Sequence, residues 1–411
     1  MNGFFRDLGE HIESRWAERD FNEGAFANIA QRALEELPPH KHLKPADLIE
    51  HVLSGAPLPE QFDLPGSFGQ PPITLFVGTG FYIDALFWVD GTTSVHQHGF
   101  EGAFQVLSGS SIHSRYRFDL DEQINSRMKL GRLHLEGVEL LTRGQTREIH
   151  AGSRFIHALF HLDRPSVTIV VRTIGNPQAQ PQWSHRKPGV AVDPFRKLPP
   201  RLMRRLQVLK LVERTQSPSE YLRALETLLI EGDAETTFYV LQEAFDHVAD
   251  AKNLEKLWVR ATKRHGARID RFRAVFEQSR RENAIINRRR SALDPEQRYF
   301  LAILLNLSDR AQIMKLVSAR FPRRDSTDTV VGWIGGLWNT HFLGADRSPF
   351  GLEDFWFNKR TGIRWSPAVE KLVRAALADR AAPTEKEARA VHRTLLESAI
   401  LRPLFNRAKG R

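Results

Sequence analysis

The sequence predicts an α+β protein in which an antiparallel β-barrel follows N-terminal helices and precedes a large all-α region. Hydrophobic residues recur at helical spacing up to about residue 54, alternate with a period of two between residues 73 and 173, and return to helical spacing from Leu198 onward. A chain of 411 residues is also longer than one hydrophobic core usually serves. More than one domain is therefore expected.

The N-terminal segment, residues 1–70, is expected to form a helical cap. Residues 3–36 carry apolar side chains at helical spacing, and the pair Pro38 and Pro39 ends this helix. Residues 45–54 predict a second, short helix, and the Gly- and Pro-rich stretch that follows is typical of a connector.

Residues 71–175 are expected to form the barrel, because eight or nine short strand-like segments follow one another without an intervening helix. Residues 176–200 are rich in Pro and Gln and predict a linker or a lid loop. Residues 201–411 predict a basic helical domain. Its helix starts include Ser217, which stands before a proline and three residues ahead of Glu220.

Charge divides the chain in the same way. Residues 1–195 hold 18 basic and 23 acidic side chains, whereas residues 196–411 hold 41 and 26. A basic half is found in proteins that bind nucleic acid, although a solvated surface produces the same composition. The basic run at Arg288, Arg289 and Arg290 lacks the interleaved aromatic residues of single-strand binding platforms, so the solvated surface is favoured.

Composition also restricts location and chemistry. The sequence has no cysteine, which excludes disulfides, thiolate metal ligands and a cysteine nucleophile. No apolar run reaches the ~18 residues of a membrane span, and the first residues do not resemble a secretory signal. We therefore expect a cytoplasmic protein with no membrane partner, whose chemistry depends on histidine, carboxylate and hydroxyl groups.

Two histidine clusters mark the candidate site. His96 and His98 are two residues apart, so both rings leave the same face of a strand and can bind one metal ion. A third ligand has to come from a distant strand, and His157 is the candidate. His161 follows it by four residues on the same face, as a hydrogen-bond partner for a ligand.

These clusters resemble the two motifs of the cupin superfamily over roughly residues 70–175. Gly91, His96, His98 and Gly109 are similar to the first motif, and His157 with His161 is similar to the second. In the family, six residues separate a carboxylate ligand from the second glycine. Gly102 occupies that position here, and Glu101 lies one residue earlier.

A three-histidine cupin site without a carboxylate looks like the thiol-dioxygenase branch. That resemblance implies Fe(II) as the metal, with O2 and a small polar molecule as the substrates of a dioxygenase or oxygenase. Zn, Mn and Ni remain alternative metals. In that branch an Arg on the strand before the histidine pair holds the substrate carboxylate, but residues 68–77 contain no Arg or Lys. A plain cysteine dioxygenase is therefore not expected.

Three further residues are candidates for contact with substrate or for catalysis. Arg172 on the last strand can hold an anion if it turns inward, and Tyr116 and His113 lie on a strand that can line the cavity. Glu101 becomes a fourth ligand if the chain turns at Gly99, although an extended chain points it away from His98.

Two other functions stay open at this point. With Glu101 as a ligand, the protein would be a non-redox metal-dependent isomerase or hydrolase. Without turnover, it would be a ligand-sensing or scaffold protein whose basic helices bind an acidic partner or nucleic acid. Barrels of this type often pair through sheet edges, so a homodimer is a further possibility.

Overall fold

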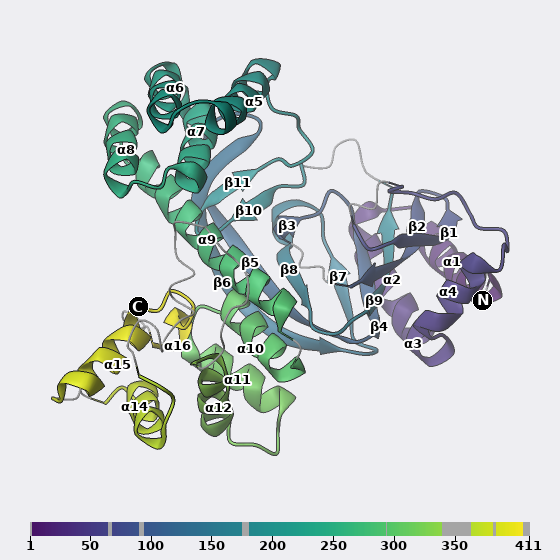
Figure 1. Cartoon of the computed structure of the whole chain (residues 1–411). Coiled ribbons are helices and arrows are strands. Elements are labelled where there is room, and N and C mark those ends of the chain that lie inside the picture. Colours follow the sequence, from purple (N-terminus) through teal and green to yellow (C-terminus); the bar gives the residue numbers. More distant parts are fainter. Residues whose placement is uncertain are drawn as a thin grey trace. The chain divides into compact units, whose positions relative to one another are not determined.

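The computed structural model describes residues 2–64, 68–89, 94–174, 181–292, 294–338, 363–380 and 384–405 (Figure 1). Gly91, a residue of the first predicted motif, lies outside these ranges. The chain folds into two compact units. The first comprises Met1–Arg117, Leu135–Trp183 and Arg289–Val330, and the second comprises Phe118–His134, Ser184–Arg288 and Val331–Arg411.

Eleven strands are present in the described residues, all within the first half of the chain. They are β1 (Pro72–Gly78), β2 (Phe81–Trp88), β3 (Val95–Gln97), β4 (Gly102–Ser108), β5 (Ser110–Gln123), β6 (Met128–Thr142), β7 (Thr146–Ile149), β8 (Ile156–His161), β9 (Ser166–Thr173), β10 (Ser184–Arg186) and β11 (Val190–Val192). One sheet has the order β1-β2-β9-β4-β7, and the other, β10-β11-β6-β5-β8-β3, closes as a barrel. The predicted fold class, antiparallel β-structure between N-terminal and C-terminal helices, is confirmed.

The first unit begins with four helices: α1 (Asn2–Ala17), α2 (Glu23–Glu36), α3 (Pro39–His42) and α4 (Pro45–Leu53). The prediction of one helix over residues 3–36 is wrong, because Asp20 and Phe21 adopt positive φ angles of 51° and 55° that no helix continues through. Asn22 then caps α2 by accepting a hydrogen bond from the Gly24 N–H at 2.8 Å.

The five-stranded sheet packs one face against these helices (Figure 1). Its other face contributes Phe104 and Val170 to a second core, which also contains Leu141 of β6 and Leu159 of β8. Phe81, Ile83 and Ala85 of β2 are fully buried in a core that also contains Leu8 and Ile12 of α1. Burial of an Ile, Leu or Phe side chain of this kind stabilises the fold by about 1.5–3 kcal/mol. Because side chains alternate along a strand, the residues between them on β2 point to the opposite face, toward the interior.

The second unit contains a segment for which the loop prediction is wrong. Within the predicted loop 176–200, β10 and β11 form an antiparallel hairpin in which His185 pairs with Ala191, and β11 pairs with β6. Three-residue strands on either side of Pro188 and Gly189 are too short for a recognisable alternation. Residues 175–180 of the predicted loop lie outside the described part of the chain.

From Pro200 onward, all the regular elements in the described residues are helices. They are α5 (Pro200–Thr215), α6 (Pro218–Glu231), α7 (Ala234–His247), α8 (Ala251–His265), α9 (Arg268–Ser291), α10 (Pro295–Asn306), α11 (Arg310–Arg320), α12 (Ser326–Trp338), α14 (Pro367–Leu377), α15 (Lys386–Glu397) and α16 (Arg402–Phe405). The predicted start of α6 is confirmed, since Ser217 and Glu220 form a reciprocal capping box. None of the helices in the described ranges has the length and apolar character that crossing a membrane requires.

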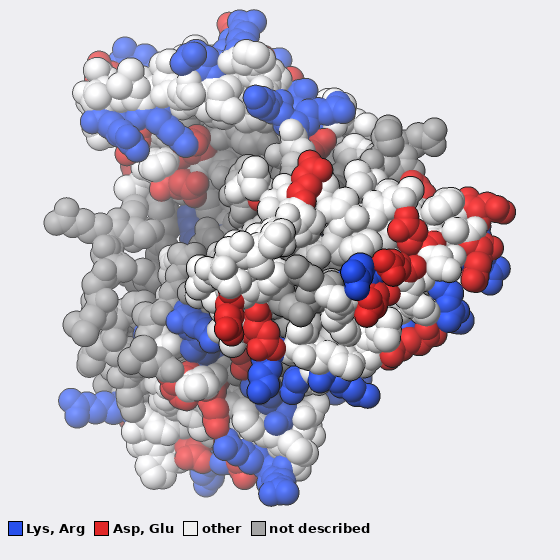
Figure 2. Space-filling view, turned by 90° about the vertical axis from the view of Figure 1, so that its right-hand side faces the viewer, with Lys and Arg blue, Asp and Glu red and all other residues white. Residues whose placement is uncertain are grey.

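Lys and Arg side chains on the face shown in Figure 2 lie in several separate groups, with Asp and Glu between them. This interspersed pattern is typical of a solvated surface rather than of a continuous basic track.

Candidate metal centre

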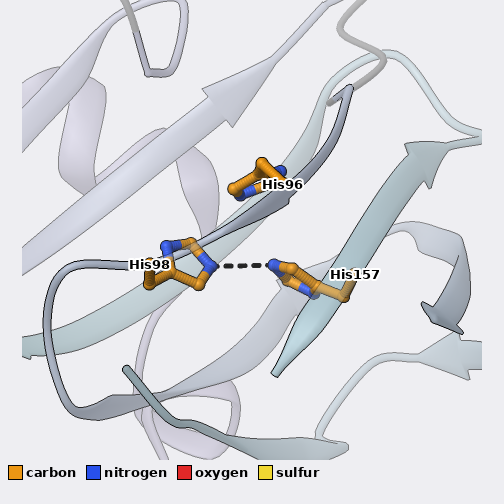
Figure 3. A group of neighbouring side chains, drawn as sticks. All are labelled: His96, His98 and His157. Carbon is orange, nitrogen blue, oxygen red and sulfur yellow. Dashed lines mark hydrogen bonds between the residues drawn. The ribbon is translucent and has the colours of Figure 1, made fainter. Parts of the chain in front are cut away.

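Strands β3 and β8 bring the three predicted ligands together (Figure 3). His96 pairs directly with His157 in the antiparallel ladder, and His98 follows two residues later at the end of β3. One nitrogen from each of the three rings lies within 4.8 Å of the others. The exposed fractions of these residues are 9%, 8% and 2% for His96, His98 and His157, so the cluster is buried.

Hydrogen bonds on the outer sides of two rings orient their inner nitrogens. Nδ1 of His96 lies 2.7 Å from the carbonyl oxygen of Ser94, so this nitrogen carries the proton and donates it. Nδ1 of His157 lies 3.1 Å from Nε2 of His113. In His96, Nε2 is therefore the nitrogen left with a lone pair, which is the form that binds a metal. The same holds for His157, because a neutral His113 that donates its Nδ1 proton to Glu139 accepts from Nδ1 of His157 through its own Nε2.

Burial keeps the three rings neutral. Desolvation lowers the pKa of His96 and holds the pKa values of His98 and His157 well below the usual range, and the neighbouring histidines lower the latter two further. Neutral imidazole is the ligand form preferred by Fe, Zn, Ni and Cu.

The spacing of the nitrogens fits a metal ion. Nε2 of His98 and Nε2 of His157 face each other at 2.8 Å (Figure 3). Two nitrogens bound at right angles to one ion, each at ~2.0–2.1 Å, would lie ~2.9 Å apart. Two imidazole nitrogens at this distance need a proton or a cation between them, so the donor set and its geometry suit a divalent metal.

A second layer of side chains supports His157 from behind. His113 uses Nε2 to contact His157 and Nδ1 to contact Oε1 of Glu139 at 2.9 Å. Glu139 is held in turn by Arg147, whose Nε donates to it at 2.9 Å. Hydrogen bonds from His113 and Arg147 lower the pKa of Glu139 to about 2, so this carboxylate stays ionised. As an ionised acceptor it keeps the proton of His113 on Nδ1 and leaves Nε2 of His113 to accept from His157.

The role found for His113 differs from the predicted one. Both of its ring nitrogens are engaged, so neither is left for a substrate. The sequence offered no signal for this role, because the contact joins β5 to β8 and depends on their register.

Replacing Glu139 with alanine is expected to weaken metal binding about 10–100-fold, because His113 loses the acceptor that orients it against His157. The affinity can be measured by competition with a chromogenic chelator for Zn(II). Glu136→Ala is the matched control, since the one ion pair of this β6 residue among the described residues is with the exposed Arg117, at 3.5 Å. Equal metal affinities for the two variants would contradict a role for His113 and Glu139 in orienting His157.

Glu101 does not join the three histidines. Its carboxylate pairs with the Arg154 guanidinium, accepts a hydrogen bond from the Ala151 N–H at 3.0 Å, and contacts Nδ1 of His150 at 3.0 Å. These contacts use both carboxylate oxygens, so the fourth-ligand alternative has no support in the described structure.

Gly102, in the position of the family's carboxylate, has no room for a side chain. It pairs with Arg172 of β9 on one side and with Ile149 of β7 on the other. A Cβ atom at Gly102 would lie 2.1 Å from the carbonyl oxygen of Val171. The close approach of β4 to β9 therefore excludes any side chain at position 102, including a carboxylate ligand.

His161 is buried on the same strand face as His157, but it does not contact a ligand histidine. Its Nδ1 lies 2.9 Å from Oγ of Ser111, and its ring stacks on Trp88 with centroids 4.6 Å apart. Desolvation lowers its pKa to about 3. The expectation that it supports a metal ligand by a hydrogen bond is therefore wrong.

Tyr116 also lies away from the cluster. In the ladder between β5 and β8, Arg115 is opposite His157 and Tyr116 is opposite Ile156. Because side chains alternate, Tyr116 occupies the face opposite to that of His113 and His157.

Arg172 does face the interior, together with an acid that the sequence pattern did not single out. Arg172 pairs with Tyr82 across β2 and β9, and Asp84 lies two residues further along β2 on the same face. Asp84 is 4% exposed. A single Asp within an otherwise apolar strand is the sequence feature that could have identified it, but the neighbouring residues do not show to which face of the sheet it points.

Burial raises the pKa of Asp84 from 3.8 to about 6, although a hydrogen bond from Thr74 and the charge of Arg172 oppose the shift, and Asp63 adds to it. The ionised form therefore destabilises the folded protein, and this cost grows as the pH rises from about 4 to about 6.

Asp84→Asn is expected to be more stable than the wild type at pH 8, by up to about 3 kcal/mol, because the amide is not charged. The difference should vanish near pH 4, where the wild-type carboxyl is protonated. Urea unfolding of both proteins at the two pH values measures it. An identical pH dependence for both proteins would contradict a buried, ionisable Asp84.

A pocket of about 530 Å³ reaches the second layer from outside. His113, Glu139, Arg147 and Phe155 line it, and the ring of Phe155 lies 4.5 Å from that of His157. Arg115, exposed at the same pocket, makes no hydrogen bond or ion pair with any other described residue.

No family model matches the sequence, and no curated protein matches it. Solved structures do match, and the three described here each cover about a quarter of the chain. A cupin-2 domain containing protein from Shewanella frigidimarina NCIMB 400 is 12% identical over 26% of this chain and 82% of its own, with a TM-score of 0.18. Hydroquinone 1,2-dioxygenase from Sphingomonas sp. TTNP3 is 13% identical over 26% and 68%, with a TM-score of 0.21.

A recombinant oxalate oxidase is 17% identical over 24% of this chain, with a TM-score of 0.18, and the match spans less than half of that enzyme, 45%. TM-scores this low carry no argument about the site, so the metal centre is inferred from its geometry alone. It is a buried group of three imidazoles on two paired antiparallel strands, and His113 contacts one of them.

Proposed function

We propose that His96, His98 and His157 hold one Fe(II) ion and that the protein is an oxygenase acting on a small polar substrate. The observation that supports this most directly is the convergence of three buried, neutral imidazoles within 4.8 Å, two of them with their outer nitrogens already hydrogen-bonded. Bound Fe(II) would supply the one-electron chemistry that O2 requires.

The surrounding residues suit such a site in two ways. Three neutral ligands leave the full charge of a divalent ion uncompensated, which favours a substrate with anionic donor atoms. Aromatic rings enclose the cluster: Phe100 lies 4.6 Å from His98, and Phe155 and Phe104 lie 4.5 Å and 6.5 Å from His157. These rings would exclude bulk water from the reacting groups.

Elemental analysis and oxygen uptake together test the proposal. Purified protein should contain about one metal ion per chain. Protein reconstituted separately with Fe(II), Mn(II), Ni(II) and Zn(II) should consume O2 only when it holds Fe(II). A panel of small thiols, amino acids and hydroxy acids serves as candidate substrates. Zn(II) is the control because it has no redox chemistry. Turnover without O2, or full activity in metal-stripped protein, would contradict the proposal.

A further inference from the structure

Two charged side chains on the inner face of the five-stranded sheet leave hydrogen-bonding atoms unused. The Arg172 guanidinium lies over the Phe100 ring at 4.0 Å and the Tyr82 ring at 5.1 Å. It makes no hydrogen bond or ion pair with the described residues, and its Nε is buried without a partner among them. Aromatic faces stabilise a guanidinium but leave its N–H groups free in the ring plane.

Asp84 is the complementary group. Its Oδ1 atom is buried and has no hydrogen-bond partner in the described structure, while a hydrogen bond with the side chain of Thr74 engages the carboxyl group. A buried carboxylate oxygen left without a donor is costly, and such groups are usually satisfied by a ligand or a bound water.

The two side chains influence one another without pairing. Arg172 lowers the pKa of Asp84, so the charges are close enough to interact, yet no ion pair within 4 Å joins them. Their pairing partners place them on one face: Arg172 is opposite Tyr82, and Asp84 is two residues away on the same strand. Arg172 and Asp84 are therefore a cation and an acid on one face of the sheet, and each has a hydrogen-bonding atom that no described residue engages.

Arg172 also lies near the metal centre. Phe100 lies between the two sites, with its ring 4.0 Å from the Arg172 guanidinium and 4.6 Å from the His98 ring. The charge of Arg172 also contributes to the lowered pKa of His98. A ligand held by Arg172 would therefore lie near the Phe100 ring, which itself contacts His98.

We propose that Arg172 and Asp84 form a two-point site for a small carboxylate that carries a hydrogen-bond donor, such as a hydroxyl or ammonium group, a short distance away. The ligand carboxylate binds the Arg172 guanidinium, and its donor group binds Oδ1 of Asp84. This inference deepens the proposed function, on which it rests for the identity of the neighbouring site, by naming the class of substrate.

Calorimetric titration of Zn(II)-loaded protein with three matched probes tests it. L-Lactate and L-alanine carry a donor beside the carboxylate, whereas propionate has the same carbon skeleton without one. Lactate or alanine is expected to bind at least ten-fold more tightly than propionate. Arg172→Met should weaken all three probes at least ten-fold, and Asp84→Leu, which has a similar shape but no acceptor, should abolish the preference over propionate.

Two controls separate the possible failures. Arg115→Met removes an unpaired cation from the other pocket and should leave every affinity unchanged. Zinc content and thermal unfolding verify that each variant is folded, and Asp84→Asn, which keeps an oxygen acceptor, should retain part of the preference if Asp84→Leu does not fold. Equal binding of all probes to metal-loaded wild type, or no binding, would overturn the two-point site while leaving the metal proposal standing. The same preference in a protein that takes up no metal would overturn the proposed function alone.

Discussion

His157→Ala is expected to lower metal affinity by more than about 100-fold, so that the purified variant contains only background metal. The ring of His157 faces Nε2 of His98 at 2.8 Å and is the one ligand that the second layer supports, through His113. Loss of an outer partner alone typically costs 10–100-fold in affinity, and loss of the ligand itself should exceed that. Elemental analysis and chelator competition provide the measurement.

His161→Ala is the matched control for this experiment. His161 is equally buried, four residues along the same strand, but its ring contacts Ser111 and Trp88 and does not contact the cluster. Both variants remove a buried imidazole and leave a cavity, so both should lose stability. Only His157→Ala should lose metal, and retention of one metal ion per chain in His157→Ala would contradict the proposed ligand set.

Gly102→Ala is expected to destabilise the first unit by about 3 kcal/mol or more. The new Cβ atom would meet the carbonyl oxygen of Val171 at 2.1 Å, and neither strand can move without breaking the pairing of β4 with β7 and β9. For the same reason, Gly102→Glu should not restore the carboxylate ligand of the resembled family. Urea unfolding measures the loss.

Gly137→Ala is the control, because a Cβ atom at this strand position has only the Arg115 side chain near it, at 3.8 Å. It should be neutral or stabilising by up to about 1 kcal/mol, since alanine restricts the unfolded chain more than glycine does. If Gly102→Ala unfolded at the same urea concentration as Gly137→Ala, the close approach of the two strands would not be the reason for glycine at position 102.

Much of the fold and the centre of the site could be predicted because their signals are local. The change of hydrophobic period marked helices, strands and helices in the right order, and the spacing of His96 and His98 placed both rings on one strand face. Two features without a hydrophobic period were not predicted. They are the left-handed turn at Asp20 and Phe21, which separates the first two helices, and the hairpin around Pro188.

The partners of the site could not be predicted, because each depends on register between strands far apart in the chain. Glu101 turns to Arg154, His113 reaches His157, and neither contact follows from residue spacing. The same holds for Asp84, whose inward direction depends on the pairing of β2 with β9.

Local pattern was thus enough to identify the histidines and the kind of β-structure that carries them, since strand alternation depends only on neighbouring residues. The roles of the charged groups around them depended on the folded sheets. A shift of one residue in the pairing of two strands would exchange inward and outward side chains, and that pairing is set by packing over the whole molecule.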